Sequence, residues 1–189
     1  MSSSKAPGEA DPGLGPDSEA VPLLMLVTDR HGTAGRDLAE VVAEAVMGGV
    51  DAVQVREKDL PDRELLAVAE AVQRAIDGRA RLLVNSRPEV AQILGAGLHL
   101  AADMEAPPRH AWPLWGRSVH SPEEALDCAL SENPDYLLIG NVFPTSSKPG
   151  SPGGGLGLVK KTVGAVARCP VLAIGGIDAT NGAAVMAAG

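Results

Sequence analysis

The sequence contains very few aromatic residues, because only 2% of its 189 residues are Phe, Trp or Tyr. A hydrophobic core must therefore be built from Ala, Val, Leu and Ile, which suit closely packed layers of strands and helices. Basic residues are also scarce, with 16 against 24 acidic residues, and the net charge is −8. This balance argues against binding to nucleic acid or to an anionic membrane, so positive groups within the site must hold any anionic ligand.

Cysteines and long apolar runs are scarce as well. Cys128 and Cys169 are the only two cysteines and form no CxxC motif, which argues against a disulfide framework or a zinc site and favours the reducing cytoplasm. No apolar run reaches the roughly 18 residues that a membrane span needs. Residues 1–21 are polar and rich in Pro and Gly, and we interpret them as a disordered leader that precedes one domain, residues 22–189.

The rest of the chain alternates short apolar runs with Ala-rich segments of helical period. Nearly continuous apolar runs are typical of parallel strands covered by helices. The predicted strands are 23–29, 50–57, 81–86, 97–102, 115–120, 135–143 and 170–177. The predicted helices are 37–49, 62–76, 87–95, 121–131, 157–167 and 179–189. Two of these helices carry start signals: Asp62 begins the second, and Ser121 followed by Pro122 begins the fourth.

Seven repeated strand–helix units suggest a (β/α)8 barrel or an open doubly wound sheet. The turn after the first strand, TDRHGTAGRD, lacks the GxGxxG fingerprint of a dinucleotide-binding sheet, so the barrel is favoured. An eighth strand and helix would need about 30 residues beyond Gly189, so we expect a (β/α)8 TIM barrel that lacks its eighth unit in this chain. The open edges of the first and seventh strands would favour a homo-oligomer.

The segment QVREK carries three polar side chains at alternate positions, Gln54, Arg56 and Lys58. A period of two places them on one face where the second strand ends, which is the end that holds the active site in such barrels. Polar groups on a core-facing strand are costly unless a ligand or a counter-charge meets them. We interpret them as ligand-binding groups, and the alternative is an internal salt-bridge network that includes Asp29.

Two glycine-rich segments follow later strands. The loop 144–155, PTSSKPGSPGGG, combines hydroxyl groups, glycines and Lys148, which is suitable chemistry for a diphosphate, although such loops are often only connections. The turn Gly175-Gly176 could present its backbone amides to a phosphate, or could contain glycine only because the turn is tight.

Single polar residues end other strands, namely Asn85, Asp103, Ser118 and His120. His120 directly precedes a predicted helix, and the helix dipole there would favour a neutral imidazole that can act as an acid or base. Strand parity, which would decide whether His120 faces the inside of the barrel, is left open by the sequence. His99 lies within a strand, and we expect it to pack in the barrel wall.

Taken together, these motifs resemble the thiamine phosphate synthase and TenI (thiazole tautomerase) family over roughly residues 22–189. The resemblance rests on LVTDR, GGVDAVQVREKDLPDREL, VNSRPEVAQILGAGLHL, GRSVHSPEEA, GNVFPTSSKPG and PVLAIGGI, in this order. It implies a TIM barrel that couples hydroxymethylpyrimidine diphosphate with thiazole phosphate to give thiamine phosphate and pyrophosphate. Small-molecule substrates and Mg²⁺ are therefore the expected ligands.

The resemblance also implies a role for each matching residue. The pyrimidine diphosphate would contact Gln54, Arg56 and Lys58, with Asn85 beside it, and Asp103 would bind magnesium. Ser118 would face the reacting centre. The implied diphosphate loop residues are Thr145, Ser147 and Lys148, and the implied thiazole phosphate residues are Gly175 and Gly176.

Two departures from the family pattern leave alternatives open. Ser86 stands where the synthases carry a magnesium-binding Asp, and Ala101-Ala102-Asp103 replaces Gly-Gln-x-Asp. Both changes, with GRSVHS, lean towards a thiazole tautomerase in which His120 moves a proton without diphosphate or metal. A third possibility is a barrel that has lost catalysis and only binds a thiamine precursor. Because Lys58 and Lys148 suit diphosphate, the synthase reaction remains the first prediction.

Overall fold

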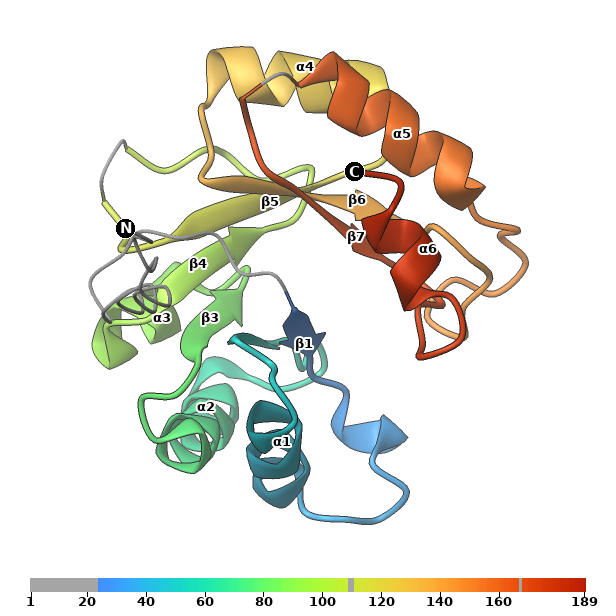
Figure 1. The fold of residues 1–189 in the computed structure, drawn as a ribbon. Helices are drawn as coiled ribbons and strands as arrows, with labels where there is room; N and C mark the ends of the chain where they lie inside the picture. The colour runs from blue at the N-terminus through green and yellow to red at the C-terminus, as the bar shows by residue number, and fades with distance from the viewer. Residues whose placement is uncertain (1–23, 109–110, 167) are drawn as a thin grey trace, which may run out of the picture.

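The computed structural model describes residues 24–108, 111–166 and 168–189 (Figure 1). The leader predicted at residues 1–21 lies outside these described residues. Seven parallel strands form one sheet in chain order. They are β1 (Met25–Val27), β2 (Ala52–Val55), β3 (Arg81–Asn85), β4 (Gly97–Leu100), β5 (Trp115–Val119), β6 (Tyr136–Gly140) and β7 (Val171–Ile174). All seven strands predicted from the apolar runs are therefore confirmed.

The helices also follow the predicted order. They are α1 (Leu38–Met47), α2 (Asp62–Ile76), α3 (Pro88–Leu94), α4 (Pro122–Ser131), α5 (Gly155–Ala165) and α6 (Gly182–Met186), with a 3-10 helix η1 (Arg30–Gly32) that the sequence did not reveal. The N-cap at Ser121 is confirmed, because its hydroxyl accepts from the amide of Glu124 at 3.1 Å. Asp62 does not cap α2: Pro61 is the N-cap, and the Asp62 carboxylate pairs with Arg87 at 3.0 Å instead.

The sheet curls, and the helices lie on its convex side (Figure 1). Helices α1 and α2 lie near β1 and β2, and α4 and α5 lie near β5, β6 and β7. Strands β1 and β7 each pair on one side only, so the described sheet is an open half-barrel. The predicted barrel without an eighth unit is thus confirmed as a fold. Self-association through the open edges remains a prediction.

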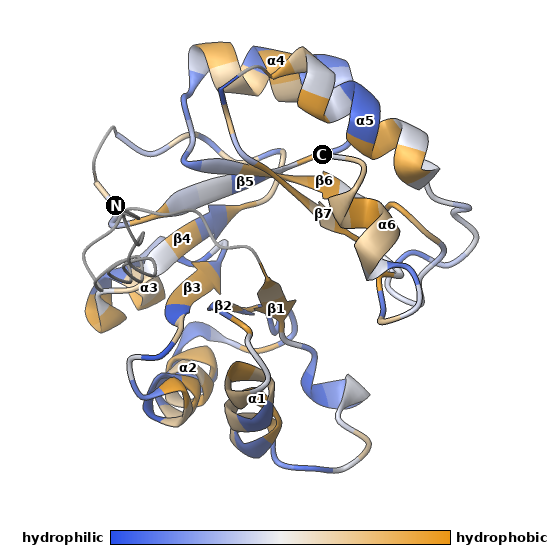
Figure 2. Ribbon diagram, viewed as in Figure 1, coloured by the Kyte–Doolittle hydropathy of each residue, from blue (hydrophilic) through white to orange (hydrophobic). Residues whose placement is uncertain are grey.

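The outward-facing strand residues form two hydrophobic clusters beneath the helices. Outward-facing residues such as Val53, Val55 and Val84 pack under α1, α2 and α3, and Leu137 and Ile139 pack under α4 and α5. Figure 2 shows β6 and β7 as largely hydrophobic, whereas α1, α2 and α5 carry both hydrophobic and hydrophilic residues. No helix in the described part of the chain is long and apolar enough to cross a lipid bilayer.

The concave face has its own apolar layer, and polar residues follow it along the strands. The layer comprises Ala52, Leu83, Leu114, Tyr136 and Leu138, with Met25, Leu172 and Ile174 packed against them. Because all strands are parallel, the polar residues that come next on the same face gather at one rim of the half-barrel. The predicted site residues that follow these strands therefore lie towards the same end of the sheet.

Candidate active site

Gln54 lies on the concave face with only 1% of its surface exposed. Its side-chain oxygen accepts a 3.2 Å hydrogen bond from Asn85 of the neighbouring strand, and its amide nitrogen lies 3.5 Å from the sulfur of Met25. The two predicted site residues are therefore brought together, and the ends of β2 and β3 share one polar surface.

Arg56 and Lys58 follow Gln54 beyond the end of β2. Arg56 is half-buried and Lys58 is exposed, and neither side chain forms an ion pair with a described residue. Asp29 accepts from the backbone amide of His31 at 3.0 Å and caps η1, so the alternative salt-bridge network with Asp29 is wrong. The two cations are thus left available to a ligand.

Glu57, between these two cations, points the opposite way and is buried, with 4% of its surface exposed. It accepts from the hydroxyl of Thr28 at 2.6 Å, and the guanidinium of Arg30 lies 3.2 Å from it. Arg30 also binds Asp59 in bidentate fashion, and this contact holds the pKa of that carboxyl well below its usual range. The loops after β1 and β2 are consequently fastened to each other.

His99 is completely buried within β4, which confirms that it packs in the barrel wall, and its side chain lies on the concave face. One ring nitrogen lies 2.9 Å from the hydroxyl of Tyr136, and the other lies 2.9 Å from the hydroxyl of Ser118. Burial, and then the positive charges of Arg56 and Arg117, lower the pKa of His99 to about 3. The ring is therefore neutral at physiological pH. The effect of Arg56 on this pKa indicates that its charge acts on the concave interior.

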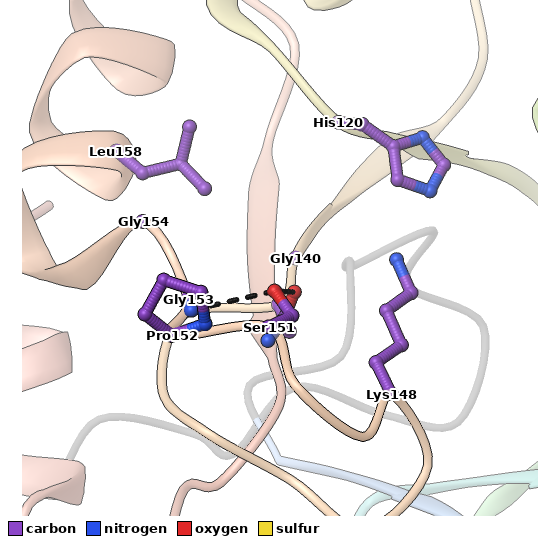
Figure 3. A pocket seen from close by; sticks show the side chains of 9 residues that line it. His120, Gly140, Lys148, Ser151, Pro152, Gly153, Gly154 and Leu158 are labelled. Atoms are coloured by element: carbon purple, nitrogen blue, oxygen red, sulfur yellow. Dashed lines mark hydrogen bonds between the residues drawn. The ribbon is translucent and has the colours of Figure 1, made fainter.

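His120 and Lys148 line an open pocket of about 320 Å³. His120 directly follows β5, and its side chain is exposed. In Figure 3 the Lys148 side chain extends towards the His120 ring, across from Leu158. The backbone amide of His120 donates to the Glu124 carboxylate at 2.7 Å, and the His120 ring nitrogen lies 3.6 Å from the same carboxylate.

The loop 144–155 has an internal frame of hydrogen bonds. Ser151 donates to the side-chain oxygen of Asn141 at 3.1 Å and accepts from the amide of Gly153 at 3.5 Å (Figure 3). Thr145 accepts from the amide of Ser147 at 3.4 Å, within a turn. Lys148 is exposed and forms no ion pair with a described residue. The frame holds the loop while leaving its cation free.

Gly175 and Gly176 form the turn after β7, with φ angles of +106° and +63°. A Cβ at Gly176 would lie 2.4 Å from the Pro144 carbonyl, so the turn requires glycine for space as well as for conformation. The Gly175 carbonyl accepts from the amide of Phe143, which joins this turn to the loop after β6. The amides of the two glycines donate to no other described residue, and their binding of a phosphate stays a prediction.

The metal ligand set is sparse. Asp103 is exposed in the loop after β4, and its carboxylate forms no hydrogen bond or ion pair with a described residue. The hydroxyl of Ser86 is buried without a hydrogen-bond partner. The described residues contain no group of three or more His, Cys, Asp or Glu that could hold a metal ion. Cys128 and Cys169 are free thiols, as predicted, and burial raises the pKa of Cys128 to about 12.

Three functional candidates were missed from the sequence: His99, Tyr136 and Glu57. Strand parity could have revealed His99, because Leu98 and Leu100 belong to the outward core and leave the residue between them on the other face. Tyr136 and Glu57 depend on contacts with distant segments, which no local pattern predicts.

The family model described as thiamine monophosphate synthase matches residues 24–189. The thiamine-phosphate synthase of Thermobifida fusca is 39% identical over 173 residues, which cover 88% of this chain and 79% of that protein. A putative thiamine-phosphate synthase of Geobacter sulfurreducens is 42% identical over 177 residues, covering 88% and 81%. The solved structure of a thiamine phosphate pyrophosphorylase from Pyrococcus furiosus has a TM-score of 0.75 and 34% identity, covering 88% of this chain and 81% of that one.

Proposed function

The chain belongs to the thiamine monophosphate synthase family, and from this membership we propose that it is a thiamine-phosphate synthase. It couples hydroxymethylpyrimidine diphosphate with thiazole phosphate and releases pyrophosphate. In this reaction the bond between the pyrimidinyl-methyl carbon and the diphosphate oxygen breaks, and its electron pair leaves with pyrophosphate. The thiazole nitrogen then donates its lone pair to the resulting cation and forms the new C–N bond.

The observation that carries the proposal is the group of unpaired cations at the rim. Arg56, Lys58 and Lys148 follow two strands of the same parallel sheet and form no ion pair with a described acid, whereas Arg30 and Arg117 are paired elsewhere. In a chain with a net charge of −8, such groups supply the local positive charge that a diphosphate requires. Positive groups already placed around the leaving pyrophosphate stabilise the negative charge that develops on it.

The other predicted residues divide between the two substrates. Gln54 and Asn85 present amide groups, and Ser118 a hydroxyl, to the pyrimidine on the concave face. The free amides of Gly175 and Gly176 suit the phosphate of the thiazole. Thr145 and Ser147 accompany Lys148 at the diphosphate. Holding the two substrates in one orientation is a large part of catalysis in a coupling of this kind.

Mg²⁺ would be held mainly by the diphosphate, with Asp103 as the protein ligand. Magnesium sites near phosphates often use only one or two carboxylates, and the free carboxylate of Asp103 fits that role. The buried, unpartnered hydroxyl of Ser86 adds only a weak neutral ligand. When bound, the ion would neutralise charge on the diphosphate oxygens. The residues fit a weak site of this kind.

The proposed setting of the reaction is the cytoplasm, with small-molecule precursors as the partners. Two free thiols are compatible with a reducing compartment. We also keep the homo-oligomer as a proposal, because strands β1 and β7 have open edges in the described sheet.

The proposal is tested by incubating the purified protein with both substrates and Mg²⁺. Release of pyrophosphate and formation of thiamine phosphate, each dependent on both substrates, are the expected result. Absence of release overturns the synthase assignment. If a thiamine precursor then still raises the melting temperature, a barrel that only binds its ligand replaces it.

A second candidate is thiazole tautomerisation, which the position of His120 in the pocket favours. A proton would move on the carboxythiazole ring without diphosphate or metal. This candidate requires that His120→Ala abolishes conversion of the carboxythiazole while Lys58→Ala preserves it. Equal loss in both variants, or no conversion by the wild type, excludes it.

A further inference from the structure

Tyr136, His99 and Ser118 form a chain of hydrogen bonds across three neighbouring strands. The Tyr136 hydroxyl lies 2.9 Å from Nδ1 of His99, and Nε2 of His99 lies 2.9 Å from Oγ of Ser118. Tyr136 and His99 are both completely buried, whereas Ser118 is half-buried. The chain therefore leads from the apolar interior to the concave surface where the pyrimidine is proposed to bind.

The surrounding residues hold the two rings in place. The His99 and Tyr136 rings stack with their centroids 5.7 Å apart and their planes at 25°. Gly116 pairs with Tyr136 in the sheet, and a Cβ at Gly116 would lie only 2.2 Å from Cζ of the tyrosine. Glycine at position 116 thus makes the space that the tyrosine ring occupies, and the position of the hydroxyl is fixed by packing.

The buried tyrosine sets the direction of the hydrogen bonds. A neutral imidazole has one N–H group and one nitrogen that only accepts. Within residues 24–108, 111–166 and 168–189, the Tyr136 hydroxyl has no hydrogen-bond partner other than His99. If Nδ1 carried the proton, the tyrosine would accept and its own O–H would be buried without an acceptor, which is costly. Tyr136 therefore donates to Nδ1, and Nε2 carries the proton.

This direction continues to Ser118. Since Nε2–H donates to the serine oxygen, the hydroxyl proton of Ser118 is not used by the protein. Among the described residues, Ser118 Oγ has no other hydrogen-bond partner. In the opposite direction the serine proton would be consumed by His99, and only lone pairs would face the ligand.

We propose that Tyr136 and His99 are positioning residues that keep Ser118 available as a hydrogen-bond donor to the substrate. The group that Ser118 meets is then an acceptor, such as the lone pair of an aromatic ring nitrogen. Identification of this ring as the pyrimidine rests on the proposed synthase function, whereas the direction of the hydrogen bonds does not. A substrate analogue with C–H in place of that nitrogen cannot accept this hydrogen bond, so we expect it to bind more weakly.

The direction is tested by NMR of the ¹⁵N-labelled full chain. Two-bond ¹H–¹⁵N correlations show which imidazole nitrogen carries the proton, and loss of one set of signals in His99→Gln assigns His99 among the four histidines. We expect a single tautomer with the proton on Nε2, unchanged between about pH 5.5 and about pH 8. A proton on Nδ1, or a ring that becomes charged in this range, overturns the proposal.

The effect on the substrate is tested with paired variants. His99→Met, which has no group that donates to Ser118, should lower kcat/KM for the pyrimidine diphosphate by about tenfold, whereas His99→Gln, which keeps a donor and an acceptor, should lose much less. In a Ser118→Ala background the His99→Met change should have no further effect. An equal loss with and without Ser118 would show that His99 acts only on stability.

Thr162→Val is the matched control, because Thr162 is also fully buried and donates only within α5, to the carbonyl of Leu158 at 2.9 Å. This variant should leave kcat/KM unchanged. If His99→Met does not fold, the NMR result on the wild type alone decides the direction. If the wild type releases no pyrophosphate, the proposed function fails while the tautomer still confirms or overturns the hydrogen-bond direction.

Discussion

Thr28 and Glu57 are joined by a 2.6 Å hydrogen bond in which the threonine hydroxyl donates to the buried carboxylate. The same hydroxyl accepts from the backbone amide of Arg56 at 3.0 Å. The end of β1 is thereby tied to the segment that carries Arg56 and Lys58. The positions of the two proposed diphosphate-binding cations depend on this contact.

Thr28→Val is expected to weaken both stability and substrate binding. Valine has nearly the same shape but cannot make either hydrogen bond, so the buried Glu57 loses a donor, at a cost of about 1–3 kcal/mol in the free energy of unfolding. Because the segment after β2 loosens, KM for the pyrimidine diphosphate should rise. Urea denaturation and steady-state kinetics measure the two effects. Thr28→Ser keeps the hydroxyl, and an equal loss in both variants would contradict this account.

His99 should make the protein less stable in acid. Its folded pKa of about 3 lies below the ordinary value of 6.5, so below pH 6.5 the unfolded chain binds a proton that the folded chain does not. The contribution of His99 to stability is complete above pH 6.5 and is lost as the pH falls towards 3, by about 1.4 kcal/mol per pH unit. Denaturation of the wild type and of His99→Gln at several pH values isolates this slope. Identical slopes would show that the ring is protonated in the folded protein.

Ser86→Asp should strengthen magnesium binding. The new carboxylate would stand where the serine hydroxyl is now buried without a partner, and the residue has a φ of +54°, a conformation that aspartate tolerates. The Mg²⁺ concentration for half-maximal activity should fall by about tenfold. Ser86→Asn, which has the same shape without the charge, is the control. If the two variants respond equally to Mg²⁺, charge at this position does not hold the ion.

Gly176→Ala should damage the proposed thiazole phosphate site. The substitution combines a φ of +63° with a Cβ 2.4 Å from the Pro144 carbonyl, so the turn must shift. KM for thiazole phosphate should rise by about tenfold or more, as the amides move from the phosphate. Gly78→Ala is the control, because its φ is +69° with no atom within 4 Å of the Cβ. An unchanged KM in Gly176→Ala would remove this turn from the site.

The strand order and the rim could be predicted because they depend on local patterns. Continuous apolar runs separated by helical segments identify a covered parallel sheet, and such a sheet collects its strand ends on one side. Alternation in QVREK predicted one shared face for Gln54, Arg56 and Lys58; Gln54 lies on the concave face, and the common role of the three residues stays a prediction. Their positions after predicted strands singled out Ser118 and Lys148, and the family resemblance then implied a role for each.

Contacts between distant residues could not be predicted in this way. The inward position of His99 follows from strand parity, but its neutrality required burial against Tyr136, 37 residues away. The burial of Glu57 depends on Thr28 and Arg30, which come from another strand end. The Asp62 carboxylate forms an ion pair with Arg87 and does not cap the start of α2, and this contact between two segments could not be predicted from the local pattern.

The central claim is that Lys58 and Lys148 hold a diphosphate during the coupling reaction. Its most direct test is the rate of pyrophosphate release with both substrates and Mg²⁺ in Lys58→Met, Lys148→Met and the control Lys160→Met, which replaces an exposed lysine on α5. The two rim variants should lose about a hundredfold in kcat/KM for the pyrimidine diphosphate, and the control should match the wild type. Undiminished release by both rim variants would contradict the account.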